Sequence, residues 1–312
     1  MPKRVLAPVS HSADSHRADA HASCSSADSH RADDVSPDTM VAVLSYNVGI
    51  QNREISGKKW RNTDGKYNKL KKDVQETFDH DTGIQILLIS EFGHMFEKMS
   101  NVEEIFTTLL AELDLTHIHL EAMPPYVALI DNTAWQVTKR ELMTDLCDHR
   151  GIGVQHLVVE HVDSRALLRI FNAHIPASVA TRARKEAIAK KLCRTATSTH
   201  GSGVAQPTAA QPTTAIPWVL AGDLNVDAGT MMKWCQPFLT KNVPCLSTSG
   251  WPRTRDAQKA DVALSQGIAL IEVQSWIGWH SQPCASDTHD AVVVMGTLNQ
   301  HPSSGDTHPV AS

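Results

Sequence analysis

Apolar residues in this chain occur in short runs that end at polar or glycine residues. Runs of this kind are typical of buried strands. The runs at 126–130, 135–138 and 154–160 follow one another closely, so we expect these strands to be antiparallel neighbours joined by short turns. Further strands are predicted at residues 40–48, 84–91, 166–176, 217–223, 260–265 and 291–295.

Other apolar residues recur at the spacing of an amphipathic helix. Tyr67, Leu70, Val74 and Phe78 would share one helix face in a segment that is rich in lysine. The predicted helix begins in the second half of the basic stretch 58–72, which follows the first predicted strand. The other predicted helices cover residues 102–113, 182–194 and 231–239.

Three segments lack the large apolar residues that a packed core needs. Residues 1–40 are rich in Ser, Ala, Asp and His, and they carry the sequence ADSHRAD twice. We expect a disordered polar tail there, a flexible insertion at 195–216 and a second polar tail at 300–312. The ordered domain is then expected to span residues 41–299.

Charge and composition limit the class of protein. The 312 residues carry a formal net charge of −5, so any phosphate-binding surface must be local. No stretch approaches the ~20 apolar residues of a membrane span, and the apolar run near the N-terminus is too short for a signal peptide. We therefore expect a soluble, intracellular protein, and the sequence leaves its oligomeric state open.

The six cysteines favour reduced thiols over a disulfide scaffold. They are spread along the chain and include no CxxC pair, which also argues against a structural zinc site. A bridge between Cys235 and Cys245 stays open.

The strand predicted at 217–223 ends in polar residues that could take part in catalysis or binding. Gly222 allows a sharp turn, and Asp223 and Asn225 follow it two residues apart. Because residues i and i+2 of an extended segment point to the same side, both side chains can face one cleft. An ordinary strand-ending turn would use the same residue types.

Polar residues also occur at the ends of other predicted strands. So many of them in one chain are not explained by strand-ending turns alone. Each of these residues abuts an apolar run, and Asn172 and His174 repeat the spacing of two. The candidates are Asn47, Glu91, Asn172, His174, Asp261 and His289.

The order of these motifs resembles the endonuclease/exonuclease/phosphatase superfamily, which has the DNase I-like fold. The superfamily pattern has an Asn after the first strand, a Glu after an apolar strand, an N-x-H or N-x-Y element, G-D-x-N and a terminal Ser-Asp-His. This chain reads Ser45-Tyr46-Asn47, Ser90-Glu91, Asn172-Ala173-His174, Gly222-Asp223-Leu224-Asn225 and Ser286-Asp287-Thr288-His289. The resemblance covers about residues 41–299. It implies an α/β (α+β) four-layer sandwich, in which two mixed β-sheets pack face to face with helices on the outside.

The resemblance also implies a divalent cation, Mg²⁺ in the first place and Mn²⁺ as an alternative, bound by oxygen ligands. Asp223 would orient or deprotonate the attacking water, and Asp261 would fix the tautomer of His289. The implied metal ligands are Glu91 and Asn47, with Asp287 as a further candidate. The implied catalytic residues are His174, Asp223, Asn225, Asp261 and His289, and the implied phosphate-binding residues are Asn172, Asn225 and His174.

The terminal motif departs from the superfamily pattern at one position. Asp usually precedes the last His directly, whereas here Thr288 intervenes between Asp287 and His289. A step of one residue along a strand moves a side chain to the opposite face. The sequence therefore leaves open whether Asp287 or Asp290 fills the acidic position.

A metal-dependent phosphoester hydrolase is the function that these features favour. The basic stretches 58–72 and 182–194 favour nucleic acid as the substrate of a phosphodiesterase, either an endonuclease or an exonuclease. The alternatives are an inositol-phosphate or phospholipid phosphoesterase of the same fold, and a catalytically decayed binding module. A third alternative is a metal-storage or interaction protein that uses the histidines of residues 1–40.

Overall fold

The structure is a computed structural model that describes the chain in segments. The described residues are 39–48, 63–79, 82–92, 101–144, 153–175, 181–198, 216–239, 245–247, 261–272, 275–276 and 291–298. Most of the predicted polar tail at 1–40, most of the predicted insertion at 195–216 and all of the tail at 300–312 lie outside them.

The first sheet has the strand order β11-β13-β1-β2-β4-β3, with β12 paired to β13. Its central pair, β1 and β2, is parallel, and the other pairs are antiparallel, so the sheet is mixed. The bounds are β1 Met40–Asn47, β2 Ile86–Ser90, β3 Ile118–Met123, β4 Tyr126–Asp131, β11 Ile268–Glu272, β12 Ser275–Trp276 and β13 Ala291–Leu298.

The second sheet has the order β5-β6-β7-β8-β10-β9 and is also mixed. Its parallel pair is β7 and β8, and the other pairs are antiparallel. Each sheet therefore has one parallel pair, whose strands end at the same edge. The bounds are β5 Trp135–Met143, β6 Val154–His161, β7 Leu167–Ala173, β8 Trp218–Asp223, β9 Cys245–Ser247 and β10 Asp261–Gln266.

The two sheets pack face to face through a shared apolar core. Val43 of β1 and Ile86 of β2 lie in one cluster with Ile170 of β7 and Val219 of β8, and all four side chains are buried. The alternation of strand side chains sends every second residue into this layer. The strands therefore carry apolar residues on both faces, which is why they read as continuous apolar runs in the sequence.

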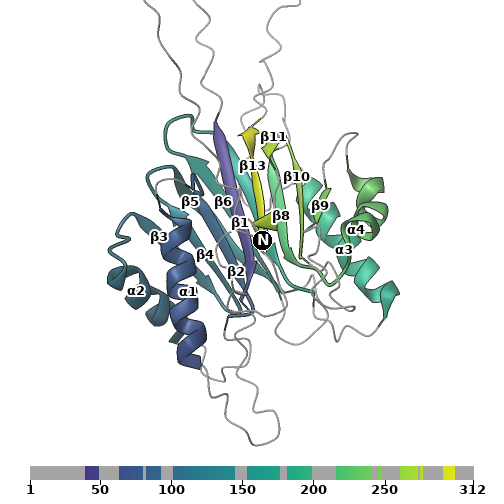
Figure 1. Cartoon of the computed structure of the whole chain (residues 1–312). Coiled ribbons are helices and arrows are strands. Elements are labelled where there is room, and N and C mark those ends of the chain that lie inside the picture. Colours follow the sequence, from purple (N-terminus) through teal and green to yellow (C-terminus); the bar gives the residue numbers. More distant parts are fainter. Residues whose placement is uncertain are drawn as a thin grey trace, which may run out of the picture. The chain divides into compact units, whose positions relative to one another are not determined.

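Helices cover the outer face of each sheet (Figure 1). Helices α1 (Thr63–Thr77) and α2 (Asn101–Glu112) pack on the first sheet, and α3 (Arg182–Thr197) and α4 (Ala228–Cys235) pack on the second. A short 3₁₀ turn, Gln236–Phe238, follows α4. The order helix, sheet, sheet, helix confirms the predicted four-layer sandwich.

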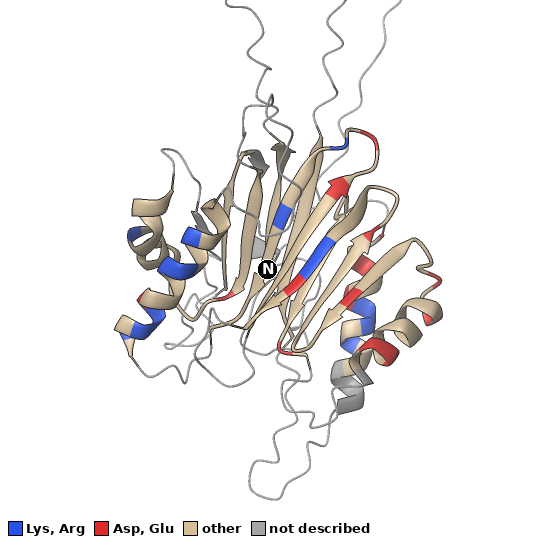
Figure 2. Cartoon of the chain, turned by 180° about the vertical axis from the view of Figure 1, so that it is seen from behind, with Lys and Arg blue, Asp and Glu red and all other residues tan. Residues whose placement is uncertain are grey.

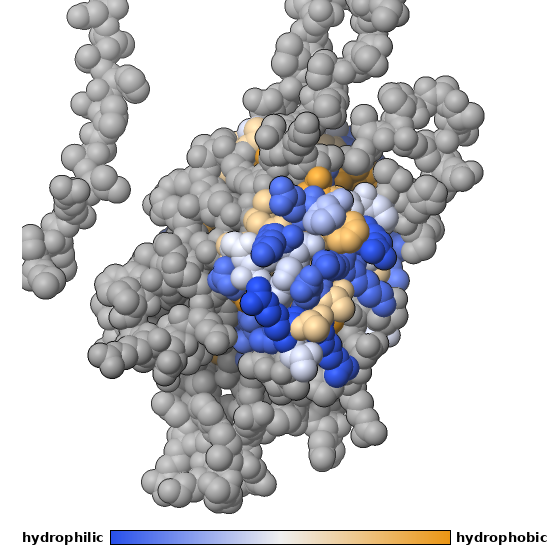
Figure 3. Space-filling view, turned by 90° about the vertical axis from the view of Figure 1, so that its right-hand side faces the viewer, coloured by the Kyte–Doolittle hydropathy of each residue, from blue (hydrophilic) through white to orange (hydrophobic). Residues whose placement is uncertain are grey.

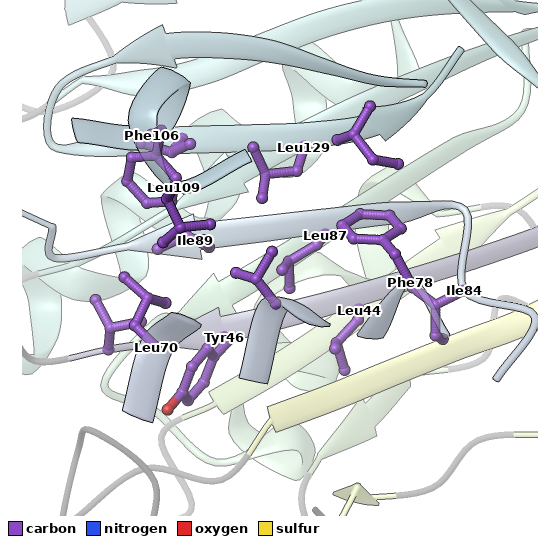
Figure 4. Close-up of a cluster of buried hydrophobic side chains, with 14 of the residues drawn as sticks. Leu44, Tyr46, Leu70, Phe78, Ile84, Leu87, Ile89, Phe106, Leu109 and Leu129 are labelled. Carbon is purple, nitrogen blue, oxygen red and sulfur yellow. The ribbon is translucent and has the colours of Figure 1, made fainter. Parts of the chain in front are cut away.

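The outer core of the first sheet shows how the helices are held. Leu44 of β1 and Leu87 of β2 meet Leu70 of α1 and Phe106 of α2 in one buried cluster (Figure 4). Burying an aliphatic or aromatic side chain of this size stabilises the fold by about 1.5–3 kcal/mol. These contacts hold α1 and α2 against the sheet.

Three expectations about the elements need correction. The strands at 126–130 and 135–138 are not paired neighbours: β4 pairs with β2 and β3, and β5 pairs with β6 in the other sheet. Strands β3 and β9 were not predicted, since β3 is an edge strand with a mixed burial pattern and β9 is short. Helix α3 continues to Thr197, because the Arg169 guanidinium donates to carbonyls of its last turn.

The expectation of reduced thiols is wrong for one pair of cysteines. Cys193 of α3 and Cys235 of α4 form a disulfide between these two helices. Both residues are buried in the core under the second sheet. The pairing depends on helix packing, which the spacing of 42 residues along the chain does not reveal.

The charged residues of the described chain lie on the helices and at strand ends, and some lie within strands (Figure 2). None of the described helices is long and apolar enough to cross a membrane.

Candidate active site

The ends of three strands bring Glu91, His174 and Asp223 together between the two sheets. One ligand atom from each residue lies within 4.8 Å of the others. The His174 Nε2 is 2.9 Å from Glu91 Oε1 and 3.8 Å from Asp223 Oδ2. All three side chains are buried. Glu91 comes from the first sheet, and His174 and Asp223 come from the second.

Strand alternation explains the placement of the residues from β1, β7 and β8. Val43, Ile170 and Ala221 face the core between the sheets. Asn47 lies four residues after Val43, His174 lies four after Ile170, and Asp223 lies two after Ala221. An even number of steps along a strand keeps a side chain on the same face, so all three side chains point between the sheets. The parallel pairs β1–β2 and β7–β8 end at the same edge, where these polar side chains meet.

Glu91 reaches the cluster in a different way. In β2, Ile86 and Leu88 face the inner core and Leu87 and Ile89 face the helices, so simple alternation would send residue 91 outward. Glu91 has a φ of 57°, in the left-handed region, which ends this alternation. A non-glycine residue in such a conformation costs on the order of 1–3 kcal/mol and is found disproportionately at functional sites.

The G-D-x-N segment is held by its own backbone contacts. Gly222 has a φ of 143°, and a Cβ there would lie 1.9 Å from the Ala173 carbonyl oxygen, so only glycine lets β8 approach β7. The Asn225 N–H donates to Asp223 Oδ1 at 3.0 Å, and its Nδ2 donates to the Ile175 carbonyl at 2.8 Å. Asn225 itself has a φ of 50°. These contacts fix Asp223 beside His174.

The second amide at the site connects the two sheets. Nδ2 of Asn47 donates to Asp223 Oδ2 at 3.0 Å, from β1 to β8. Both carboxylate oxygens of Asp223 therefore accept hydrogen bonds, one from Asn47 and one from the Asn225 backbone. The carboxylate is held in one orientation as a result.

Asn172 makes a further connection between the sheets. Its Nδ2 donates to the Ile89 carbonyl at 3.0 Å and to Gln155 Oε1 at 3.1 Å. Ile89 lies two residues before Glu91, so this contact ties β7 to the end of β2. Asn172 is fully buried, and both of its N–H donors are used inside the protein.

The structure describes only the backbone of one predicted site residue and does not describe several others. The backbone of Asp261 is in register with that of Asp223, because β10 pairs antiparallel with β8. His289, Asp287, Thr288 and Asp290 lie outside the described residues, immediately before β13. Their roles stay predictions.

Two residues beside the cluster were not singled out in the sequence. Tyr126 begins β4, and its hydroxyl accepts a hydrogen bond from the His174 N–H at 3.1 Å. Gln155 of β6 joins Asn172 to the Glu121 carbonyl, to which its Nε2 donates at 3.0 Å. A polar Gln155 inside an apolar strand was a signal in the sequence, whereas a tyrosine at a strand start is ordinary.

Several solved structures have a similar fold. A Bacteroides thetaiotaomicron protein of the endonuclease/exonuclease/phosphatase family has a TM-score of 0.59 and 11% identity, over 85% of this chain and 98% of that one. ANGEL2, a 2′,3′-cyclic phosphatase, has a TM-score of 0.57 and 13% identity, over 84% and 96%. TDP2 of D. rerio, complexed with a single-strand DNA product, has a TM-score of 0.53 and 11% identity, over 83% and 99%.

This chain has the endonuclease/exonuclease/phosphatase fold. No protein-family model and no curated protein sequence matches it. At identities this low, the structural likeness establishes the fold and leaves the substrate open. In these three comparisons the likeness covers 83% to 85% of this chain.

The cluster in this endonuclease/exonuclease/phosphatase fold has the donor atoms that a divalent cation requires. Glu91 and Asp223 offer carboxylate oxygens, which suit Mg²⁺, and the imidazole of His174 is also accepted by Mn²⁺. Buried carboxylates need hydrogen bonds or positive charge nearby to remain ionised. The candidate metal site therefore comprises Glu91, His174 and Asp223, with Asn47 bonded to Asp223.

Proposed function

We propose that this protein is a divalent-metal-dependent phosphoester hydrolase and that it acts as a phosphodiesterase on nucleic acid. The observation that carries the proposal is the buried cluster of Glu91, His174 and Asp223 at the meeting strand ends. Two carboxylates and an imidazole within 4.8 Å are not explained by ordinary turns or by core packing.

Each residue of the cluster has a separate task in the proposed reaction. Of the three residues that could bind a cation, Glu91 is its ligand in this proposal, with Asn47 beside it and Asp287 as a further candidate, whereas His174 and Asp223 act on the phosphate and on the water. A bound Mg²⁺ or Mn²⁺ supplies positive charge against the charge that develops on the phosphoryl group. Asp223 orients the attacking water or takes its proton, because its carboxylate is held in place by two hydrogen bonds.

Hydrogen-bond donors complete the proposed site. His174 and Asn225 donate to phosphate oxygens, and His289 with Asp261 supports the reaction from the terminal motif. Catalysis of this kind depends on positioning and on fixed charges more than on covalent chemistry. Asn172 was predicted to bind phosphate too, but both of its donors are used within the fold. We therefore propose that Asn172 positions β7 against β2.

The charge on α3 supports nucleic acid as the substrate class. This helix carries six basic residues and one acidic residue, although the whole chain has a net charge of −5. Lys185 of α3 donates to the Asn225 carbonyl at 3.1 Å, so this basic helix adjoins the site. Figure 3 shows a largely hydrophilic surface on the side of the molecule where α3 and α4 lie. A local basic surface of this kind suits contact with a phosphate backbone.

The second basic stretch gives weaker support. Lys71 of α1 pairs with Glu112 of α2 at 2.7 Å, and Lys72 pairs with Glu76 at 3.5 Å. These pairs reduce the positive charge that the described part of the stretch presents. Residues 58–62 of the stretch lie outside the described residues.

A panel of substrates tests the proposal. We expect wild-type protein with Mg²⁺ or Mn²⁺ to hydrolyse single-stranded and double-stranded oligonucleotides, and chelation by EDTA to stop the reaction. Release of product is measured by gel electrophoresis for oligonucleotides and by phosphate analysis for inositol phosphates and phospholipids. Hydrolysis of the inositol or lipid substrates alone would refute the nucleic-acid class. Hydrolysis of none of them with either cation would refute the hydrolase and leave a binding module.

Variants of the two basic helices sharpen the same experiment. The double substitution Arg182→Ala with Lys191→Ala removes two exposed cations of α3. We expect it to raise the KM for an oligonucleotide several-fold. The slope of the logarithm of the binding constant against the logarithm of the salt concentration should become less steep by roughly one per lost phosphate contact. Hydrolysis of a small phosphodiester should not change. The matched control is Lys71→Ala with Lys72→Ala on α1; equal effects of both pairs would contradict a specific role for α3.

A further inference from the structure

We propose that Tyr126 is a positioning residue for His174, an inference that rests on the proposed function of the cluster. Tyr126 begins β4 in the first sheet, whereas His174 follows β7 in the second sheet. Nothing in the motif pattern of the sequence points to Tyr126. Its contacts nevertheless reach His174, which is one of the two cluster residues that come from the opposite sheet.

The hydroxyl of Tyr126 uses both its donor and its acceptor capacity. It donates to the Gly153 carbonyl at 2.6 Å and accepts from the His174 backbone N–H at 3.1 Å. Gly153 directly precedes β6, so one hydroxyl joins the start of β4 to β6 and to the end of β7. Tyr126 is fully buried, and water does not replace these contacts readily in such a place.

The same end of β4 also holds the neighbour of Glu91. The Phe92 N–H donates to the Pro125 carbonyl at 3.3 Å, one residue before Tyr126. The start of β4 therefore contacts the segment that carries Glu91 and the segment that carries His174. The gap of 2.9 Å between their side chains depends on both segments keeping these places.

Loss of the hydroxyl has a defined structural consequence. A phenylalanine at residue 126 keeps the ring and its packing, but it leaves the Gly153 carbonyl and the His174 N–H without this partner. Buried polar groups that lose their partner shift or admit water. Either change moves the backbone of His174 and with it the imidazole. Small displacements of a catalytic group lower the rate of the chemical step more than the binding of substrate.

Tyr126→Phe tests the inference against Tyr46→Phe. Tyr46 is an equally buried tyrosine whose hydroxyl donates to Asp73 Oδ2 at 2.9 Å, and its side chain packs on the helix side of the first sheet. We expect Tyr126→Phe to lower kcat about tenfold with KM changed less than twofold, and to shift the His174 ring resonances in NMR spectra of the metal-free protein. Tyr46→Phe should lower the melting temperature by a similar amount and change neither kcat nor the ring resonances.

Several results would overturn the inference. An unchanged kcat and unchanged His174 resonances in Tyr126→Phe would do so, as would an equal loss of kcat in Tyr46→Phe. If Tyr126→Phe does not fold, hydrogen exchange of the His174 amide in wild-type protein decides. Strong protection supports the hydrogen bond to Tyr126, and rapid exchange contradicts it. The resonances and the exchange rate remain informative even if the protein hydrolyses no phosphoester, so failure of the proposed function is distinguishable from failure of this inference.

Discussion

Glu91→Gln is expected to reduce metal-dependent phosphodiester hydrolysis by about 10³-fold, the loss typical of removing a group that stabilises transition-state charge. The substitution keeps the size of the side chain but removes the negative charge that attracts the cation. It also weakens the contact with His174, which lies 2.9 Å from the carboxylate. The measurement is the initial rate of hydrolysis with Mg²⁺ or Mn²⁺ at saturating substrate.

Glu121→Gln is the matched control for this substitution. Glu121 is also a buried glutamate of the first sheet, and it pairs with His119 at 2.8 Å and with Arg140 at 3.2 Å. Its loss should affect stability and leave the catalytic rate near that of wild type. If Glu91→Gln retains wild-type activity, or if both variants lose activity equally, Glu91 does not have the proposed role.

Gly222→Ala is expected to destabilise the fold by at least about 3 kcal/mol, as overpacking and backbone strain act together. A Cβ at this position would lie 1.9 Å from the Ala173 carbonyl oxygen, a backbone atom that cannot move without separating β7 from β8. The positive φ of 143° adds strain for any residue with a side chain. Because Asp223 follows directly, activity should fall with stability. Denaturant unfolding followed by circular dichroism measures the effect.

Gly83→Ala separates the two causes of that destabilisation. Gly83 also has a positive φ, 65°, but the nearest atom to its Cβ would be the flexible Met295 Cε at 3.9 Å. Only the cost of the left-handed conformation applies there, which is about 1–2 kcal/mol. Equal stabilities of the two variants would show that the close approach of β8 to Ala173 is not required.

The resemblance to the endonuclease/exonuclease/phosphatase superfamily implied the layers, which the structure confirms, and local patterns in the sequence marked the candidate site residues. Apolar runs marked the buried strands, and the spacing of two residues pointed to Asp223 with Asn225 and to Asn172 with His174, which lie at or just beyond the ends of β8 and β7. The left-handed backbone of Glu91 could not be predicted, since nothing local distinguishes it from an ordinary strand end. The pairing of β4 with β2 and not with β5 could not be predicted either, because the chain passes from the first sheet to the second between β4 and β5.

The contacts that join the sheets were also beyond prediction. Asn172 reaches Ile89 across 83 residues of chain, and Tyr126 reaches His174 across 48. A single sequence contains no signal for pairs so far apart. Asn172 was predicted to bind phosphate, and its Nδ2 donates to Ile89 and Gln155 inside the protein, which is why we propose that it positions β7 against β2.

Binding of Mn²⁺ followed by electron paramagnetic resonance tests the central claim most directly, because it needs no assumption about the substrate. We expect wild-type protein to bind one Mn²⁺ per chain at a site from which Mg²⁺ displaces it. Glu91→Gln should weaken that binding at least about tenfold, as loss of groups at metal sites commonly does. Glu121→Gln should leave it unchanged. Absence of saturable binding to wild-type protein, or equal binding to Glu91→Gln, would contradict a metal site that depends on Glu91.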